Sequence, residues 1–188
     1  MREPGGKRVD NPLQSLSCIA ALPAVTSVNR DNTIRFDQAK SLEKGAAYAT
    51  SVISAQLAVN PKVRVLNSAQ VSVLVPGALD GDVDRISELA RKVDCEGVLV
   101  ATVQRFKQRQ GTAVSVQEAA SVEFTLSLYH APSGIVLWTS DYRETQQSLL
   151  ENLFSLSKMQ KRGFKWVTAE ELLKQGVLER LAECPYLQ

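Results

Sequence analysis

Gly97-Val-Leu-Val-Ala-Thr-Val-Gln-Arg-Phe106 is the stretch that decides the fold, together with the two apolar segments that follow it. It starts as an unbroken apolar run, which is typical of a central strand covered on both faces, and turns polar toward its end. Residues 121–129 alternate between apolar and polar, the clearest period-two pattern in the chain. Ala131-Pro-Ser-Gly134 predicts a hairpin turn into a strand over 135–142. We therefore expect three neighbouring strands of one sheet.

The last of these strands has four residues that we expect to share one face: Val136, Trp138, Ser140 and Tyr142. Ahead of the three strands, an apolar run over 18–25 predicts a first strand, which ends near Pro23 because proline cannot donate a ladder hydrogen bond. Apolar residues at three- and four-residue steps predict a long helix over 37–59, with Asp37 as its N-cap. The first part of the chain therefore alternates strand and helix.

Two further helices are marked by their N-terminal residues. After a short strand at 63–66, the segment 71–75 could be another strand, and Asp82 then caps a helix over 83–93. Near the end of the chain, Thr168 and Glu171 form a capping box. Gly176 lies inside this last helix, where it could mark a close approach to the sheet.

The expected fold is α/β (α+β mixed), with a single mixed β-sheet of about five strands in the order β-α-β-α-β-β-α and helices packed on it. Right-handed crossovers make the first three strands parallel, and the hairpin adds antiparallel strands. Residues 1–15 are polar and rich in Pro and Gly, so we expect a flexible leader. Residues 16–188 are expected to form a single globular domain.

Composition and charge are those of an ordinary globular protein, with 44% apolar and 22% charged residues. The formal charge of +2, from 22 basic and 20 acidic residues, gives no field that would recruit nucleic acid, so no nucleic-acid partner is expected. Met1 to Asn11 lacks the apolar centre of a signal peptide. Two hypotheses stay open: a cytoplasmic protein, or a mature secreted domain whose targeting segment precedes this sequence.

The three cysteines, Cys18, Cys95 and Cys184, form no C-x-x-C pair, and with one histidine in the chain a zinc site is not expected. Cys18 and Cys95 lie at the edges of apolar strands, where a small buried thiol is the ordinary interpretation. A disulfide between Cys95 and Cys184 is possible in an oxidising compartment.

Motifs for catalysis are missing from the sequence. Neither G-x-G-x-x-G, nor G-x-x-x-x-G-K-[ST], nor G-x-S-x-G occurs. His130 stands beside the hairpin turn, where we expect a solvated residue, and the acidic residues Asp80, Asp82 and Asp84 fit a turn and a helix cap better than a metal loop. We therefore expect no enzyme, no cofactor and no metal.

The best candidate for an interaction site is a basic, aromatic segment over 154–166. Its aromatic and basic residues suit a membrane interface, where rings sit at headgroup depth, or a protein contact anchored by Trp and Arg. A third interpretation is that the rings close the core while the lysines face water. The candidate contact residues are Phe154, Lys158, Lys161, Arg162, Phe164, Lys165 and Trp166.

Three segments carry a family resemblance. They are Ile19-Ala-Ala-Leu-Pro-Ala24, the run from Leu89 to Val103, and the hairpin from Leu126 to Ser140. Together they resemble the CsgG/PelC-like bacterial periplasmic lipoprotein domains, whose fold is similar to the amino-terminal domain of TolB. Ala24 and His130 depart from the family's usual residues at a strand end and a loop. No long amphipathic hairpins of a channel type are visible, which puts pore formation in doubt.

The resemblance implies a non-enzymatic domain in the periplasm, anchored to the outer membrane by a lipid on a segment absent from this sequence. It implies partners among other envelope proteins, a role in secretion or envelope assembly, and a possible homo-oligomer. An alternative of another class is a cytoplasmic α/β adaptor or small-ligand-binding domain.

Overall fold

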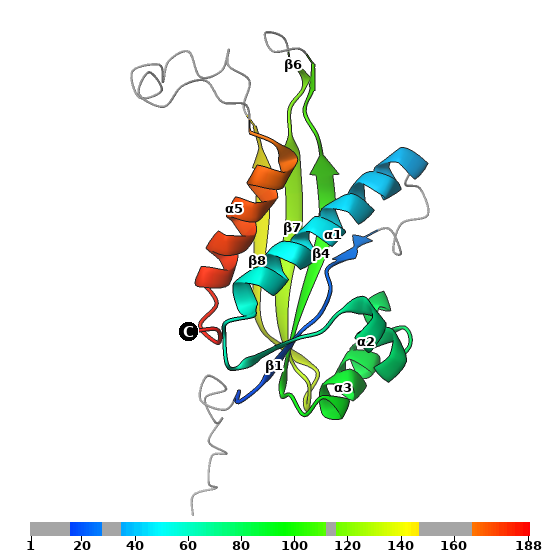
Figure 1. Cartoon of the computed structure of the whole chain (residues 1–188), viewed down its shortest axis with the longest axis vertical. Helices are drawn as coiled ribbons and strands as arrows, with labels where there is room; N and C mark the ends of the chain where they lie inside the picture. Colours follow the sequence, from blue (N-terminus) through cyan, green and yellow to red (C-terminus); the bar gives the residue numbers. More distant parts are fainter. Residues whose placement is uncertain (1–15, 28–34, 112–115, 147–166) are drawn as a thin grey trace, which may run out of the picture.

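The computed structural model describes residues 16–27, 35–111, 116–146 and 167–188 (Figure 1). The expected leader over 1–15 lies outside the described residues. Within them, no helix has both the length and the apolar character needed to cross a membrane.

A six-stranded mixed sheet organises the fold, with the strand order β3-β1-β4-β7-β8 and β2 beside β4. A two-stranded ribbon, β5 and β6, extends beyond it. The strands are β1 (Ile19–Ala21), β2 (Val25–Thr26), β3 (Val63–Val65), β4 (Gly97–Lys107), β5 (Gln110–Gly111), β6 (Val116–Glu118), β7 (Ser121–His130) and β8 (Ile135–Thr145).

Pairing directions confirm the predicted mixed sheet. β1 runs parallel to both β3 and β4, as right-handed crossovers require. β7 pairs antiparallel with β4 and with β8, and the predicted turn joins β7 to β8. Gly134 adopts a φ of 68° in this turn, a left-handed conformation that glycine accepts without steric cost.

Helices cover one face of the sheet and one end of the other face. Figure 1 shows α1 and α5 lying side by side over one face, whereas α2 and α3 lie at the end of the sheet where β1 and β4 begin. The helices are α1 (Phe36–Leu57), α2 (Ser68–Leu74), α3 (Val83–Lys92) and α5 (Ala169–Ala182), with a 3-10 turn, η3, at Ala78–Asp80.

Two apolar clusters form the core, and the pleat of β1 and β4 divides residues between them. Leu99 on β4 packs in the cluster below α1 and α5, together with the alternating residues of β7. Val98 packs in the cluster below α2 and α3. Both side chains are buried, with 2% and 0% of their surface exposed, as expected for a strand covered on both faces.

Two local predictions are wrong. The segment 71–75 is not a strand: Val71 lies inside α2, whose first turn is held by Asn67, which accepts a 2.8 Å hydrogen bond from the N–H of Gln70. The N-cap of α1 is Arg35, not Asp37, which lies in the first turn and pairs with Arg35 at 3.3 Å. The caps predicted at Asp82 and at Thr168 with Glu171 are confirmed.

Val136 does not share a face with Trp138. The register shifts between the pairs Leu128–Trp138 and Tyr129–Val136, so Leu137 is an extra residue in β8. Such a bulge turns the following residues over. As a result Leu137 and Trp138 both pack against the core, whereas Val136 is 50% exposed.

Two helical glycines allow close helix–sheet contact. A Cβ at Gly176 would lie 2.6 Å from the ring of Tyr142, which confirms the predicted close approach of the last helix. A Cβ at Gly45 in α1 would lie 2.6 Å and 2.7 Å from Cγ and Cβ of Phe106. Because these atoms are close to the backbone of β4, Phe106 cannot move away by a simple rotamer change.

Gly45→Ala is therefore expected to destabilise the protein by about 1–3 kcal/mol, because overpacking outweighs the better helix propensity of alanine. The free energy of unfolding in denaturant measures this. Ala47→Leu on the exposed side of the same helix is the control and should change stability by less than about 0.5 kcal/mol. Equal effects at the two positions would contradict the close contact.

Candidate functional site

A polar groove lies between the start of α1 and the distal part of β4, and we call it the α1–β4 groove. β2 pairs with β4 only at Thr102 and Val103, so the distal part of β4 has no neighbour on that side among the described strands. The groove has a volume of about 880 Å³, within the range of ligand and peptide sites. Its lining residues are Arg35, Asp37, Gln38, Ser41, Leu42, Gln104, Arg105, Phe106, Lys107, Gln108, Gln110, Glu118, Ala119, Ser121 and Thr145.

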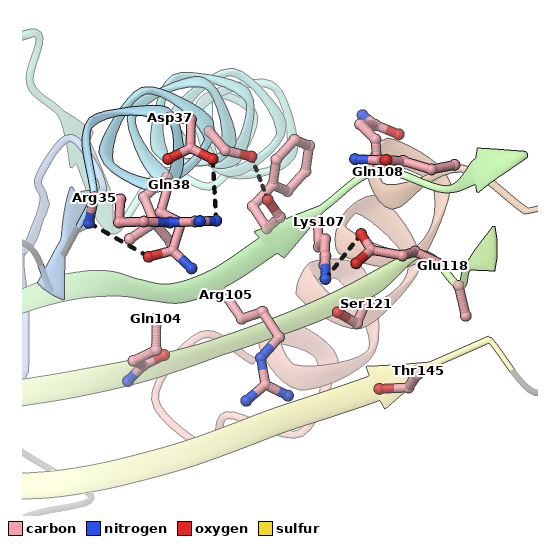
Figure 2. Close-up of a pocket in the computed structure, with 15 residues that line it drawn as sticks. Arg35, Asp37, Gln38, Gln104, Arg105, Lys107, Gln108, Glu118, Ser121 and Thr145 are labelled. Atoms are coloured by element: carbon pink, nitrogen blue, oxygen red, sulfur yellow. Dashed lines mark hydrogen bonds and ion pairs between the residues drawn. The ribbon is translucent and has the colours of Figure 1, made fainter.

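Charged groups in the groove occur in pairs. Figure 2 shows Arg35 against Asp37 at the α1 side and Lys107 against Glu118 at the ribbon side. The two pairs have N–O distances of 3.3 Å and 2.9 Å. Arg105 extends from β4 to Glu123 on β7, at 3.3 Å. The groove therefore offers alternating charges and amides rather than a single-sign field.

A bulge in β4 determines the direction of the polar side chains in its distal part. The register with β7 shifts between Val103 and Arg105, so Gln104 is the extra residue. Gln104 Nε2 donates to Thr125 Oγ1 at 2.8 Å, and Thr125 Oγ1 donates to Asp141 Oδ1 at 2.6 Å. The amide oxygen of Gln104 is buried and accepts no hydrogen bond within the described part of the chain. This chain of hydrogen bonds links the groove to β8 across three strands.

Glu170 at the start of α5 ties the groove to both helices. Its carboxylate accepts a 2.6 Å hydrogen bond from Gln108 Nε2 and lies 3.2 Å from Lys44 Nζ on α1. Burial by itself raises the pKa of Glu170, but the hydrogen bonds from Gln108 and Lys44 outweigh it, so the pKa lies below its ordinary value. The Glu170 carboxylate thus links α1 and α5 to Gln108, the residue that follows β4.

Chemically, the groove can form many hydrogen bonds and ion pairs with a polar partner. Its lining contains no histidine or cysteine, the usual partners in nucleophile–base pairs. Within the described ranges, no three His, Cys, Asp or Glu side chains gather closely enough to hold a metal ion.

The predicted contact residues Phe154, Lys158, Lys161, Arg162, Phe164, Lys165 and Trp166 all lie outside the described residues. Sequence reasoning missed the groove. Its only local signal is the run of amides and cations over 104–110, and nothing in that run indicates that the start of α1 lies beside it.

The cysteine pairing also corrects the sequence prediction. Cys18 and Cys95 form a disulfide, whereas Cys184 is a free, buried thiol whose pKa is raised by burial. The reason is the parallel register of β1 and β4, which places Ile19 beside Gly97. The residues that come just before two neighbouring parallel strands lie at the same end of the sheet. The possible Cys95–Cys184 disulfide is wrong.

Glu96 completes a corner around this disulfide, where the described part of the chain begins. Its carboxylate accepts hydrogen bonds from the N–H of Ser17 at 2.6 Å and from Ser17 Oγ at 2.9 Å. Burial by itself raises the pKa of Glu96. The hydrogen bonds from Ser17 and the N–H of Cys18, with the nearby His130, outweigh burial, so the pKa lies below its ordinary value. The start of the domain is thus held by a covalent bond and a charged clamp.

Comparison with known proteins finds similarity only at the level of solved structures. No protein-family model matches the chain, and no curated protein matches it. Among solved structures, 47 chains match. One is the PelC dodecamer from Paraburkholderia phytofirmans, 15% identical over 91% of this chain and 87% of that chain, with a TM-score of 0.48.

Two further solved structures are similar over a smaller share of this chain. Lipoprotein GNA1162 from Neisseria meningitidis is 14% identical over 77% of this chain and 95% of that chain, with a TM-score of 0.44. The LpoB C-terminal domain from Salmonella enterica is 14% identical over 70% of this chain and 84% of that chain, with a TM-score of 0.37. The CsgG part of the resemblance inferred from the motifs stays a prediction.

Replacing Glu96 by glutamine tests the charged clamp. Because the folded-state pKa of Glu96 is lowered, its carboxylate stabilises the fold above the ordinary Glu pKa, and this contribution disappears as the pH falls through the folded-state pKa. Glu96→Gln should therefore lower the free energy of unfolding at about pH 7, by no more than about 1 kcal/mol because solvent screens this site, and the loss should shrink as the pH falls through the folded-state pKa.

Chemical denaturation at a series of pH values measures the effect. Glu43→Gln, at an exposed position on α1, is the control and should leave stability nearly unchanged across the range. A loss at Glu96→Gln that is equally large in acid would contradict the role of the charge.

Proposed function

We propose that this chain is a non-enzymatic domain of the bacterial periplasm, anchored at the outer membrane, which supports secretion or envelope assembly through protein contacts and self-association. The observation that carries the proposal is the disulfide between Cys18 and Cys95. Disulfides persist in oxidising compartments such as the periplasm and are rare in the cytosol. This observation weighs against the cytoplasmic adaptor.

The position of the disulfide fits a tethered domain. It joins Cys18, the residue before β1, to Cys95, two residues before the central strand β4, at the end of the sheet where the described chain begins. Ser17 is held there a second time by Glu96. A pull on an N-terminal anchor would therefore act on a crosslinked corner and not on β1 alone. The motif resemblance implies such an anchor on a preceding segment.

Contacts with other proteins would use polar surfaces. The α1–β4 groove presents amides and paired charges along an exposed strand, which suits an extended peptide segment of a partner. The basic aromatic segment over 154–166 stays a second candidate, for a protein or a membrane.

The first test is the state of the thiols and the location of the protein in its source cells. Cells are lysed in denaturant that contains a thiol-alkylating reagent, so that buried thiols react as well, and the mass of the protein is then measured. We expect one alkyl group, on Cys184, because Cys18 and Cys95 are joined. We also expect the protein in the envelope fraction. Three alkyl groups with recovery in the soluble cytosol would overturn the proposed compartment.

The second test separates membrane contact from protein contact at the basic aromatic segment. The chain contains two tryptophans, so Trp138→Phe leaves Trp166 as the single reporter. If rings of this segment enter the headgroup layer, anionic vesicles will shift the Trp166 emission to shorter wavelength, and vesicles of neutral lipid will shift it less. The same titration with Lys161→Glu and Arg162→Glu added is the control. No shift with anionic vesicles removes the membrane contact and leaves the protein contact.

A further inference from the structure

Among the described strands, β8 is the outermost strand beside β7, and none of them pairs with its outer edge. It spans Ile135–Thr145, and within the described part of the chain it pairs only with β7. Natural proteins commonly shorten, cover or interrupt such an edge, because its unpaired backbone groups template the addition of another strand. An unpaired edge of this length is therefore a candidate site for the addition of another strand.

The hydrogen-bond pattern shows which residues present free backbone groups. The N–H of Gln146 donates to the carbonyl of Ala120 at 2.9 Å, so these two residues form a hydrogen-bonded pair. Such pairs alternate along an antiparallel ladder. The residues that direct their N–H and C=O groups away from β7 are therefore Thr139, Asp141, Arg143 and Thr145.

Side chains at the centre of this edge carry opposite charges and are positioned by β7. Asp141 accepts the 2.6 Å hydrogen bond from Thr125, and Arg143 lies 3.6 Å from Glu123. Both side chains are exposed on the face of the sheet opposite α1 and α5. Asp141 and Arg143 are two residues apart on the strand, so they lie on the same face.

We propose that β8 pairs antiparallel with β8 of a second copy of this chain about a two-fold axis at Tyr142. In this register Asp141 lies opposite Arg143 of the partner subunit, and Arg143 lies opposite Asp141 of the partner subunit. Both pairs are of the kind that exchanges two backbone hydrogen bonds, since all four residues direct these groups outward. The sheets of the two copies become one continuous sheet.

Charge selects this register over its neighbours. A shift by two residues in one direction places Asp141 opposite Asp141 of the partner subunit, and a shift in the other direction places Arg143 opposite Arg143 of the partner subunit. Like charges directly opposite each other destabilise a sheet, whereas opposite charges stabilise it. Only the register centred on Tyr142 satisfies both charged residues, which argues for a second copy as the occupant.

The helix side of the edge leaves room for the added strand. A hollow of about 350 Å³ lies between β8 and α5. Its lining is largely polar and includes Tyr142, Glu144, Gln175, Glu179 and Arg180. The residues of a second β8 that face this side near the axis are Ser140, Tyr142 and Glu144 of the partner subunit. Each carries a polar group that suits such a lining, and Tyr142 of the partner subunit lies opposite Tyr142.

This inference rests on the self-association in the proposed function and assigns a surface to it. Charge reversal tests the surface with the whole chain. Asp141→Arg alone creates two Arg–Arg pairs per dimer, and Arg143→Asp alone creates two Asp–Asp pairs. Each single variant should weaken the dimer by about tenfold or more. An equimolar mixture of the two variants restores opposite charges at both positions and should dimerise.

Light scattering after size-exclusion chromatography measures the result as molar mass. We expect a twofold fall for each single variant and recovery for the mixture and for the double variant D141R/R143D. Arg105→Asp is the matched control, because Arg105 also pairs with Glu123 on the same face but lies on β4, two strands away from the outer edge of β8. It should keep the molar mass of the wild-type chain. Circular dichroism confirms that each variant is folded.

Cysteine crosslinking tests the register without changing these charges. In the proposed dimer Ser140 lies opposite Glu144 of the partner subunit, at the spacing that a disulfide can bridge. A mixture of Ser140→Cys and Glu144→Cys should form a covalent dimer under mild oxidation, and neither variant alone should do so. A wild-type oligomer that all variants leave unchanged overturns the β8 edge and keeps self-association. A strictly monomeric wild-type chain overturns both.

Discussion

The burial of the first half of β4 on both faces is the constraint on which the rest of the structure depends. Val98 and Leu99 point to opposite sides, and each needs an apolar layer above it. Burying such a side chain stabilises the fold by about 1.5–3 kcal/mol, so neither face can be left to solvent. α1 and α5 provide one layer and α2 with α3 the other, and β1 fills the neighbouring position in the sheet. Elsewhere on the same face, Gly45 and Gly176 let α1 and α5 lie close to Phe106 and Tyr142, where a side chain would not fit.

The same pairing decides the chemistry at the start of the domain. Because β1 and β4 are parallel and in register from Ile19 and Gly97, the residues that precede them meet at one end of the sheet. Cys18 and Cys95 can therefore join, and Glu96 is brought beside Ser17. A register shift of a few residues would have left two separate thiols and an ordinary surface carboxylate. The periplasmic location that we propose rests on this disulfide, and the disulfide can form only because of the register between β1 and β4.

The second half of β4 serves a different purpose. The bulge at Gln104 ends the double-sided burial and turns polar side chains toward solvent and toward β7. From there the hydrogen bonds through Thr125 to Asp141 connect the α1–β4 groove with the outer edge at β8. Two strand edges that have no partner among the described strands are therefore linked by polar contacts on one face of the sheet, which suits a domain that acts by contact with other chains.

The sequence by itself determined the mixed sheet with its three parallel strands, the hairpin and the helix caps at Asp82 and Thr168, because these follow from local periodicity, turn residues and the right hand of crossovers. It could not show that 71–75 is helical, since a short apolar run suits either structure and the Asn67 cap decides between them. Only the tertiary structure decided the Cys18–Cys95 pairing, the two bulges and the groove, because each depends on register between segments far apart in the chain. A bulge adds one residue to one strand only. Its position depends on how that strand pairs with its neighbour, which the sequence of one strand does not show.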